Sequence, residues 1–88
     1  MITKEENNTI IQCSEKYGVS LVMLFGSSIE SEDANDIDLA VKGIEPSLFF
    51  KFYGELIKLL PKPVDLIDLS HKSLFNDIIE ETGVVIYG

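Results

Sequence analysis

The sequence predicts an α/β (α+β) fold with a small mixed β-sheet flanked by helices, and two observations lead to this prediction. Short apolar runs typical of strands alternate with longer segments whose apolar residues recur at helical spacing. Glycine or proline lies at most borders between these segments, as expected where helices and strands end. A chain of 88 residues has room for one domain, which we assign to residues 1–88.

The first half of the chain is predicted to form one helix and then two strands. Thr3 with Glu6 three residues later is a capping-box pattern, and the helix that follows is expected to end at Gly18. The apolar, partly β-branched run Val19–Phe25 suits a buried strand. A second strand is predicted at Asp36–Val41, where apolar residues resume after a polar loop.

The second half is predicted to form a helix, a strand, a helix and a strand. The strands are Val64–Leu69 and Val84–Tyr87. The helix between them is expected to be capped by Ser70 and closed by Gly83, and the earlier helix over 46–60 starts and stops at prolines. The apolar faces of the two helices comprise Leu48, Phe49, Phe52, Tyr53, Leu56, Leu59 and Leu60 in the first and Leu74, Phe75, Ile78 and Ile79 in the second.

Charge and composition exclude several classes of function. The chain has 7 Lys+Arg against 15 Asp+Glu, a net charge of −8, so it has no basic patch to hold nucleic acid directly. Cys13 is the only cysteine, and no apolar run approaches the roughly 18 residues of a membrane span. We therefore expect a cytoplasmic protein without a membrane segment. Because a domain of this size buries a modest core, a homo- or hetero-oligomer would add to it.

The acidic pair Asp36 and Asp38 stands where a strand would otherwise bury apolar residues. Alternate residues of a strand point to the same face, so the two carboxylates would lie roughly 6.5 to 7 Å apart and repel each other. Mg²⁺ is the natural counter-charge, since it favours carboxylate oxygens and completes its coordination with substrate phosphates. The pair therefore predicts a site for a metal and a nucleotide.

Two further segments are expected to join this site. Gly26 and Ser27 follow the first strand, where a residue without a side chain lets backbone N–H groups approach an anion and a hydroxyl can donate to a phosphate. The third strand offers a carboxylate at Asp65 and another at Asp68, which by alternation face opposite sides. Only one can join the pair; we favour Asp65, and assign Asp68 to the following turn.

These motifs, Gly26-Ser27, "NDIDLAV" and "VDLIDL" in this order, resemble the minimal nucleotidyltransferase (MNT-type) branch of the DNA polymerase beta-like superfamily. The resemblance covers roughly residues 19–69 and implies a nucleotidyltransferase-like fold. It further implies that the loop of Gly26, Ser27 and Ser28 binds a nucleoside triphosphate. In this family the acidic pair, Asp36 and Asp38 here, holds Mg²⁺, with two ions expected when nucleotide is bound, and the third acid, Asp65, completes the metal site and helps to activate a hydroxyl.

The chain departs from the family pattern in the loop after Gly26-Ser27. Family members often carry an arginine soon after Gly-Ser and another glycine before the acidic pair. Here the corresponding residues read Ser28, Ile29, Glu30 and Ser31. The loop is short and acidic, and acids near a triphosphate would repel it.

Two functions follow from the resemblance. The first is Mg²⁺-dependent transfer of a nucleoside monophosphate, most simply AMP from ATP, to a hydroxyl of a partner protein, as the antitoxin of a HEPN-type toxin. The second is a catalytically weak or inactive binding module of the same fold that masks a basic partner protein stoichiometrically. The acceptor hydroxyl and the preferred base stay open at this point.

Other motifs do not fit. A calcium-binding loop starting at Asp33 would need glycine at Asp38 and glutamate at Ile44, and no Gly-Lys-Ser/Thr follows Gly26 as a P-loop requires. We give His71 and Cys13 no functional role. The remaining clusters are interpreted as core or subunit contact for Phe49, Phe50, Phe52 and Tyr53, and as a solvated loop for Glu30, Glu32 and Asp33.

Overall fold

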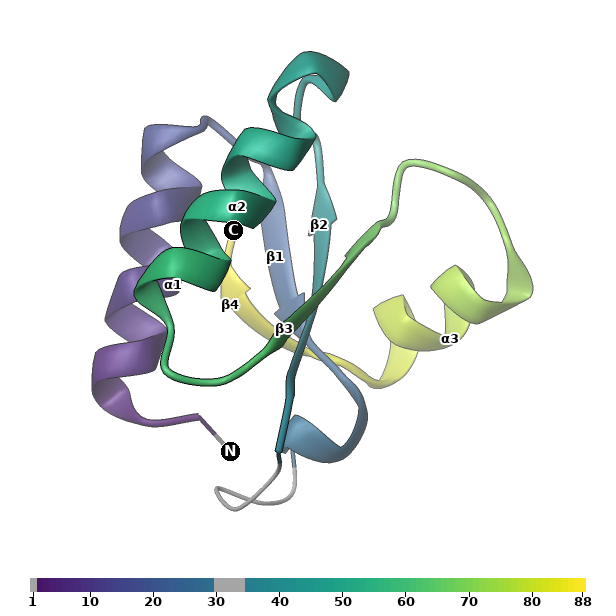
Figure 1. Ribbon diagram of the computed structural model, residues 1–88. Helices are drawn as coiled ribbons and strands as arrows, with labels where there is room; N and C mark the ends of the chain where they lie inside the picture. The colour runs from purple at the N-terminus through teal and green to yellow at the C-terminus, as the bar shows by residue number, and fades with distance from the viewer. Residues whose placement is uncertain (1, 30–34) are drawn as a thin grey trace.

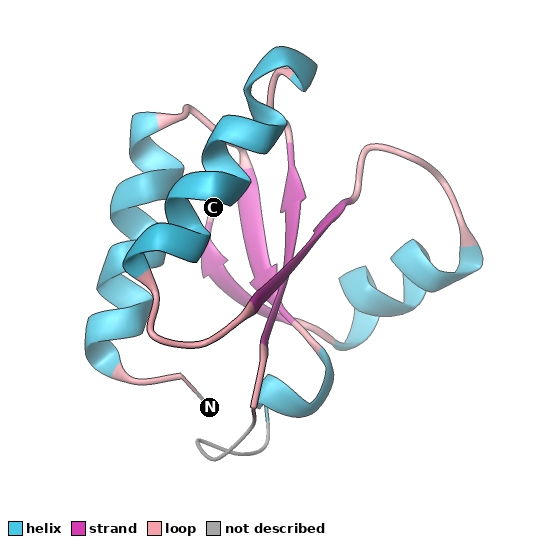
Figure 2. Ribbon diagram, in the orientation of Figure 1, coloured by secondary structure: helices cyan, strands magenta, loops and turns pink. Residues whose placement is uncertain are grey.

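A computed structural model of the chain, which describes residues 2–29 and 35–88, has a four-stranded sheet with helices on both faces (Figures 1 and 2). The strands lie in the order β3-β2-β1-β4. β2 is parallel to β3, whereas β1 is antiparallel to both β2 and β4. The sheet is therefore mixed, and the predicted fold class is confirmed. The elements of the described residues are α1 (Lys4–Lys16), β1 (Leu21–Leu24), β2 (Ile37–Lys42), α2 (Phe49–Leu59), β3 (Val64–Asp68), α3 (Leu74–Thr82) and β4 (Val84–Tyr87), with short 3₁₀ turns at Gly26–Ile29 and Pro46–Leu48.

The predicted capping box starts α1. The Thr3 hydroxyl accepts a hydrogen bond from the Glu6 N–H at 3.1 Å, and the Thr3 N–H donates to the Glu6 carboxylate at 2.8 Å. At the other end, Gly18 has a φ of 64°, which ends the helix in the left-handed conformation that glycine adopts without strain. The local sequence alone thus determines both ends of this helix.

The start of α3 corrects the sequence prediction. Ser73, and not Ser70, is the N-cap, and its side chain accepts a hydrogen bond from the Asn76 N–H at 3.0 Å. Ser70 lies in the preceding turn, where its own N–H donates to a carboxylate oxygen of Asp68 at 2.9 Å. The helix therefore begins three residues later than predicted, after a longer loop from β3.

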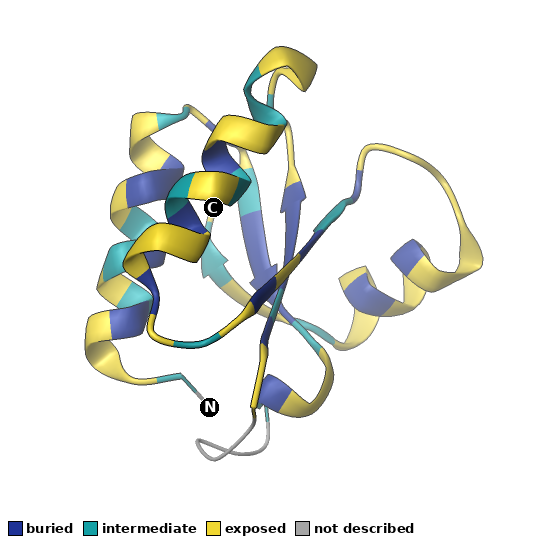
Figure 3. Ribbon diagram, viewed as in Figure 1, coloured by how far each residue is buried: buried dark blue, intermediate teal, exposed yellow. Residues whose placement is uncertain are grey.

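The two faces of the sheet are covered unequally. α1 and α2 lie side by side over one face, and α3 lies over the other (Figure 1). The large buried cluster is on the α1/α2 face and includes Phe52 and Leu56 of α2, both 0% exposed. Figure 3 shows long exposed stretches on α3, where Ile79 is buried.

Two predicted apolar faces are only partly buried. On α3, Leu74, Phe75 and Ile78 are exposed, because the helix contacts the sheet along a narrow line through Ile79. On α2, Leu59 is also exposed, since the buried stripe follows Phe52 and Leu56 into Leu60 at four-residue spacing. Periodicity correctly predicted these helices and overestimated how much of each is covered.

No helix among the described residues has the length and apolar character needed to span a membrane.

Candidate functional site

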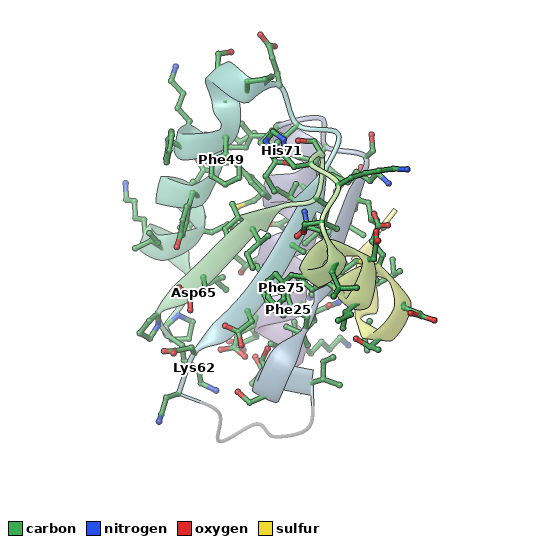
Figure 4. All side chains as sticks on the ribbon, turned by 90° about the vertical axis from the view of Figure 1, so that its right-hand side faces the viewer. Phe25, Phe49, Lys62, Asp65, His71 and Phe75 are labelled. Carbon is green, nitrogen blue, oxygen red and sulfur yellow. The ribbon has the colours of Figure 1, made fainter. Side chains whose placement is uncertain are left out.

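The parallel pairing of β2 with β3 brings two of the predicted acids together. Asp38 on β2 is the register partner of Asp65 on β3, so both side chains leave the sheet on the same face. This is the face toward α3, because Ala40, two residues after Asp38, packs with Ile79 of that helix. Figure 4, viewed from the α3 side, shows Asp65 on this face together with Phe25 and Phe75.

The third acid, Asp36, lies just outside the strand. β2 begins at Ile37, one residue later than predicted, and the Asp36 side chain is exposed. Partial burial and then the negative charges of Asp65 and Asp36 raise the pKa of the Asp38 carboxyl above its usual range. The other two predicted acids are therefore close enough for their charges to act on Asp38.

The acids do not form a ready-made metal cage. Within 2–29 and 35–88, no three His, Cys, Asp or Glu side chains are gathered as a metal-binding cluster. The chemistry of the donors still suits Mg²⁺, since carboxylate oxygens are its preferred protein ligands and the half-buried Asp38 faces two other negative charges.

The turn after β1 lies directly against Asp38. Gly26 has a φ of 70°, and a Cβ placed on it would lie 2.7 Å from the Asp38 carboxylate oxygen Oδ2. A residue with a side chain would therefore both strain the backbone and displace the carboxylate. Gly26 and Ser27 are exposed at the same edge, so the predicted loop and the predicted acids are brought together.

Ser28 differs from its two neighbours because it is buried. Its hydroxyl donates to the Phe25 carbonyl at 2.7 Å and accepts from the Asp38 N–H at 3.2 Å. The hydroxyl proton is thus used inside the protein, and the place of Ser28 in the nucleotide-binding loop stays a prediction. A small polar residue at Ser28, the third residue of the turn between the paired strands β1 and β2, is the sequence feature that could have indicated this role.

Asp68 occupies the role expected for it. Its carboxylate accepts the Ser70 N–H, and its carbonyl accepts a hydrogen bond from the Asn76 side chain at 3.2 Å. The same Asn76 amide also donates to the His71 carbonyl at 2.7 Å. Asp68 and the buried Asn76 therefore organise the loop that leads into α3. The sequence analysis had not predicted this role for Asn76.

The remaining predicted residues are distributed as follows. Cys13 is buried in the core, and burial followed by the charge of Glu55 raises the pKa of its thiol. Phe52 is buried, Phe49 and Tyr53 pack against the core, and Phe50 is 79% exposed. The Glu30, Glu32 and Asp33 prediction lies outside the described residues.

Comparison with known proteins gives a family match and several structural matches. The family profile described as "Polymerase beta, Nucleotidyltransferase" matches residues 8–88. Curated proteins give no significant match. Solved structures do, and several of the similar chains come from toxin–antitoxin complexes.

Three of these structures are informative. A chain of the complex between tri-AMPylated Shewanella oneidensis HEPN toxin and MNT antitoxin is 25% identical, with a TM-score of 0.74 over 97% of this chain and 71% of that chain. A chain of a toxin–antitoxin complex with AMP-PNP is 25% identical, with a TM-score of 0.72 over 93% and 73%. A chain of the MntA–HepT complex is 24% identical and has the same fold, with a TM-score of 0.74 over 98% and 73%.

Proposed function

Because the chain belongs to the polymerase beta nucleotidyltransferase family, we propose that it transfers AMP from ATP to a hydroxyl of a HEPN-type toxin and so acts as its antitoxin. The observation that carries the proposal is the register pairing of Asp38 with Asp65 beside the Gly26-Ser27 turn. Similar chains were solved with an AMPylated HEPN toxin and with AMP-PNP, which supports both the nucleotide and the partner.

Each element of the site has a role in this proposal. Asp36, Asp38 and Asp65 would hold Mg²⁺, which when bound neutralises phosphate charge and lowers the pKa of a nearby hydroxyl. The exposed Gly26-Ser27 backbone and the Ser27 hydroxyl would donate to the triphosphate. Ser28 would support the turn from inside.

The proposed chemistry is an in-line displacement at the α-phosphorus of ATP. The acceptor oxygen forms a bond to the α-phosphorus while the bond from that phosphorus to the bridging oxygen of the β-phosphate breaks, and pyrophosphate leaves. Asp65 takes the proton of the acceptor hydroxyl, a role that suits an exposed carboxylate paired with Asp38, the residue that lies against the nucleotide turn. The proton acceptor therefore comes from β3 and the nucleotide turn follows β1, one on each side of β2.

A second candidate is a masking module that blocks the toxin without turnover. The net charge of −8 favours binding to a basic protein surface, and it would do so with or without ATP. The two functions therefore differ in stoichiometry and in their need for nucleotide.

A substoichiometric assay separates them. A HEPN-type toxin encoded beside the gene of this chain is mixed with one-twentieth as much of this protein, Mg²⁺ and α-labelled ATP. We expect silencing of the whole toxin pool and an adduct of AMP mass on it, no transfer by Asp38→Asn, and near-normal transfer by the matched control Asp68→Asn. Silencing that needs equal amounts of the two proteins and no ATP would support the masking module and overturn the enzyme.

A further inference from the structure

The turn that follows β1 contains an irregular hydrogen-bond arrangement centred on Ser28. Leu24 pairs with Leu39 in the antiparallel ladder, which makes Phe25 and Asp38 the next opposing residues. The Phe25 N–H donates to the Asp38 carbonyl at 3.0 Å, as in a regular ladder. The reciprocal bond, from the Asp38 N–H to the Phe25 carbonyl, would complete a regular pair of this kind.

The Ser28 hydroxyl takes the place of that reciprocal bond. It accepts from the Asp38 N–H at 3.2 Å and donates to the Phe25 carbonyl at 2.7 Å, so the two backbone groups are joined through one oxygen. The side chain that does this is 2% exposed. A serine three residues along the chain thus relays a ladder bond at the point where the backbone turns away from the sheet.

The relay has a geometric consequence for the site. Two hydrogen bonds in series span more space than one, so the Phe25 carbonyl and the residue after it stay further from β2 than direct pairing would allow. That next residue is Gly26, which already lies against the Asp38 carboxylate: a Cβ there would be 2.7 Å from Oδ2. Closing the ladder directly would push Gly26 further toward the carboxylate.

We propose that Ser28 is a positioning residue that sets the separation between the Gly26-Ser27 turn and the Asp38 carboxylate, and thereby the affinity for Mg²⁺ with nucleotide. The inference rests on the proposed function and assigns Ser28 to the protein side of the site. Ser28→Ala leaves the Asp38 N–H and the Phe25 carbonyl without the relay, and they must then take water, because direct pairing would push Gly26 onto the Asp38 carboxylate. Water in place of the buried hydroxyl shifts the Gly26-Ser27 turn relative to that carboxylate.

The chain offers a matched control in Ser14. Its hydroxyl donates to the Ile10 carbonyl at 2.7 Å within α1, and the residue is 0% exposed. Ser14→Ala therefore removes the same atoms from an equally buried position on the opposite face of the sheet. Any general effect of losing a buried hydroxyl should be common to the two variants.

The first measurement is binding of Mg²⁺ with AMP-PNP to the full chain by isothermal titration calorimetry. We expect Ser28→Ala to weaken binding about 10- to 100-fold, the range for residues that orient metal ligands, and Ser14→Ala to change it less than about twofold. Folding of both variants is checked by their amide NMR spectra. A folded Ser28→Ala variant that binds like the wild type would overturn the proposal.

The second measurement needs neither metal nor nucleotide. Amide hydrogen exchange of Asp38 should be slow in the wild type and in Ser14→Ala and at least about tenfold faster in Ser28→Ala, because its N–H bond partner is gone. An unchanged exchange rate at Asp38 would contradict the proposed role of Ser28 even if the chain transfers AMP. If the wild-type chain binds no Mg²⁺ with AMP-PNP, the proposed function is wrong. The exchange rates would still show whether the Ser28 hydroxyl binds the Asp38 N–H.

Discussion

The two faces of the sheet differ in how they are built and in what they carry. Among residues 2–29 and 35–88, thirteen buried residues form the core cluster between the sheet and α1/α2, against four in the cluster under α3. β2 contributes to both, because Ile37, Leu39 and Val41 point toward α1/α2 while Asp38 and Ala40 point toward α3. One strand thus divides its side chains between packing and chemistry.

This difference teaches why the site is where it is. An ionised carboxylate under a tightly packed helix pair would lose its hydration without compensation. On the α3 face the acids stay partly hydrated, as the proposed nucleotide site requires. Stability is concentrated on one face, which leaves the other free to hold like charges close together.

Substitution in the two cores should separate the faces most strongly. Phe52 is 0% exposed and packs edge-on against Tyr17 with ring centroids 5.6 Å apart, so Phe52→Ala should cost about 3–5 kcal/mol. Ile79→Ala in the smaller cluster should cost nearer 2 kcal/mol, since the exposed neighbours can settle around the cavity. Urea denaturation of both variants measures the difference. Equal losses would mean that α3 is as firmly packed as α2.

The next largest effect is on transfer and compares two acids of β3. Asp65→Asn should lower the rate of AMP transfer about 100-fold or more, because the proton acceptor and a proposed metal ligand are lost. Asp68→Asn should leave the rate close to that of the wild type, since Asp68 serves the turn through the Ser70 N–H. Single-turnover rates with labelled ATP give the comparison. The reverse result would show that Asp68, and not Asp65, is the third acid of the site.

Much of the fold followed from local sequence, and the exceptions have physical causes. The capping box, the glycine at 18 and the strand Val84–Tyr87 were predicted correctly because short-range hydrogen bonds and backbone conformation decide them. Strand order was not predictable, because it depends on contacts between distant segments. Ser70 and Ser73 are equally good caps by type, and the carboxylate of Asp68 decides between them by binding the Ser70 N–H.

The candidate site also combines features that local sequence predicts with features that depend on strand pairing. The closeness of Asp68 to Ser70 correctly indicated that Asp68 serves the turn, and the register pairing places Asp65 next to Asp38. The role of Ser28 could not be read from the sequence, because it depends on which strand β1 pairs with and on the register of that pairing. Asp36, Asp38 and Asp65 as metal ligands and Gly26 and Ser27 as nucleotide contacts stay predictions.

A smaller effect concerns pH and the repulsion on the α3 face. The pKa of Asp38 is raised in the folded chain, so ionisation of this carboxyl destabilises the fold. The protonated carboxyl therefore gives the folded protein a stability advantage that is fully present below the unfolded pKa and is lost as the pH rises through the folded pKa. Asp38→Asn should therefore be as stable as the wild type or slightly more stable at pH 7 without metal. This advantage should shrink as the pH falls through the raised pKa of Asp38. Urea midpoints of both proteins between pH 7 and pH 4 test this; an advantage that grows on acidification would contradict it.

The smallest effect should come from two ion pairs among the described residues, one on each face. Lys16–Glu55, at 2.7 Å, joins α1 to α2, and Lys42–Glu80, at 2.9 Å, joins β2 to α3. Both are exposed to solvent and screened by salt, so each contributes little. Glu55 also accepts from the Tyr17 hydroxyl at 3.4 Å and the Cys13 thiol at 3.6 Å, so its removal disturbs three contacts between the helices.

We therefore expect Glu55→Gln to lower the urea midpoint more than Glu80→Gln, and both to lower it less than Ile79→Ala. The hydrogen bond from Lys16 lowers the pKa of Glu55, so its contribution is present above the ordinary pKa of glutamate and is lost as pH falls through the lowered value. Salt at about 0.5 M should shrink the Glu80 effect more than the Glu55 effect, because screening acts on charge pairs and leaves the neutral donors Tyr17 and Cys13 in place. An equal response of the two variants to salt would show that Glu55 acts through Lys16 alone, and that the α1/α2 face owes its stability to apolar packing without this polar link.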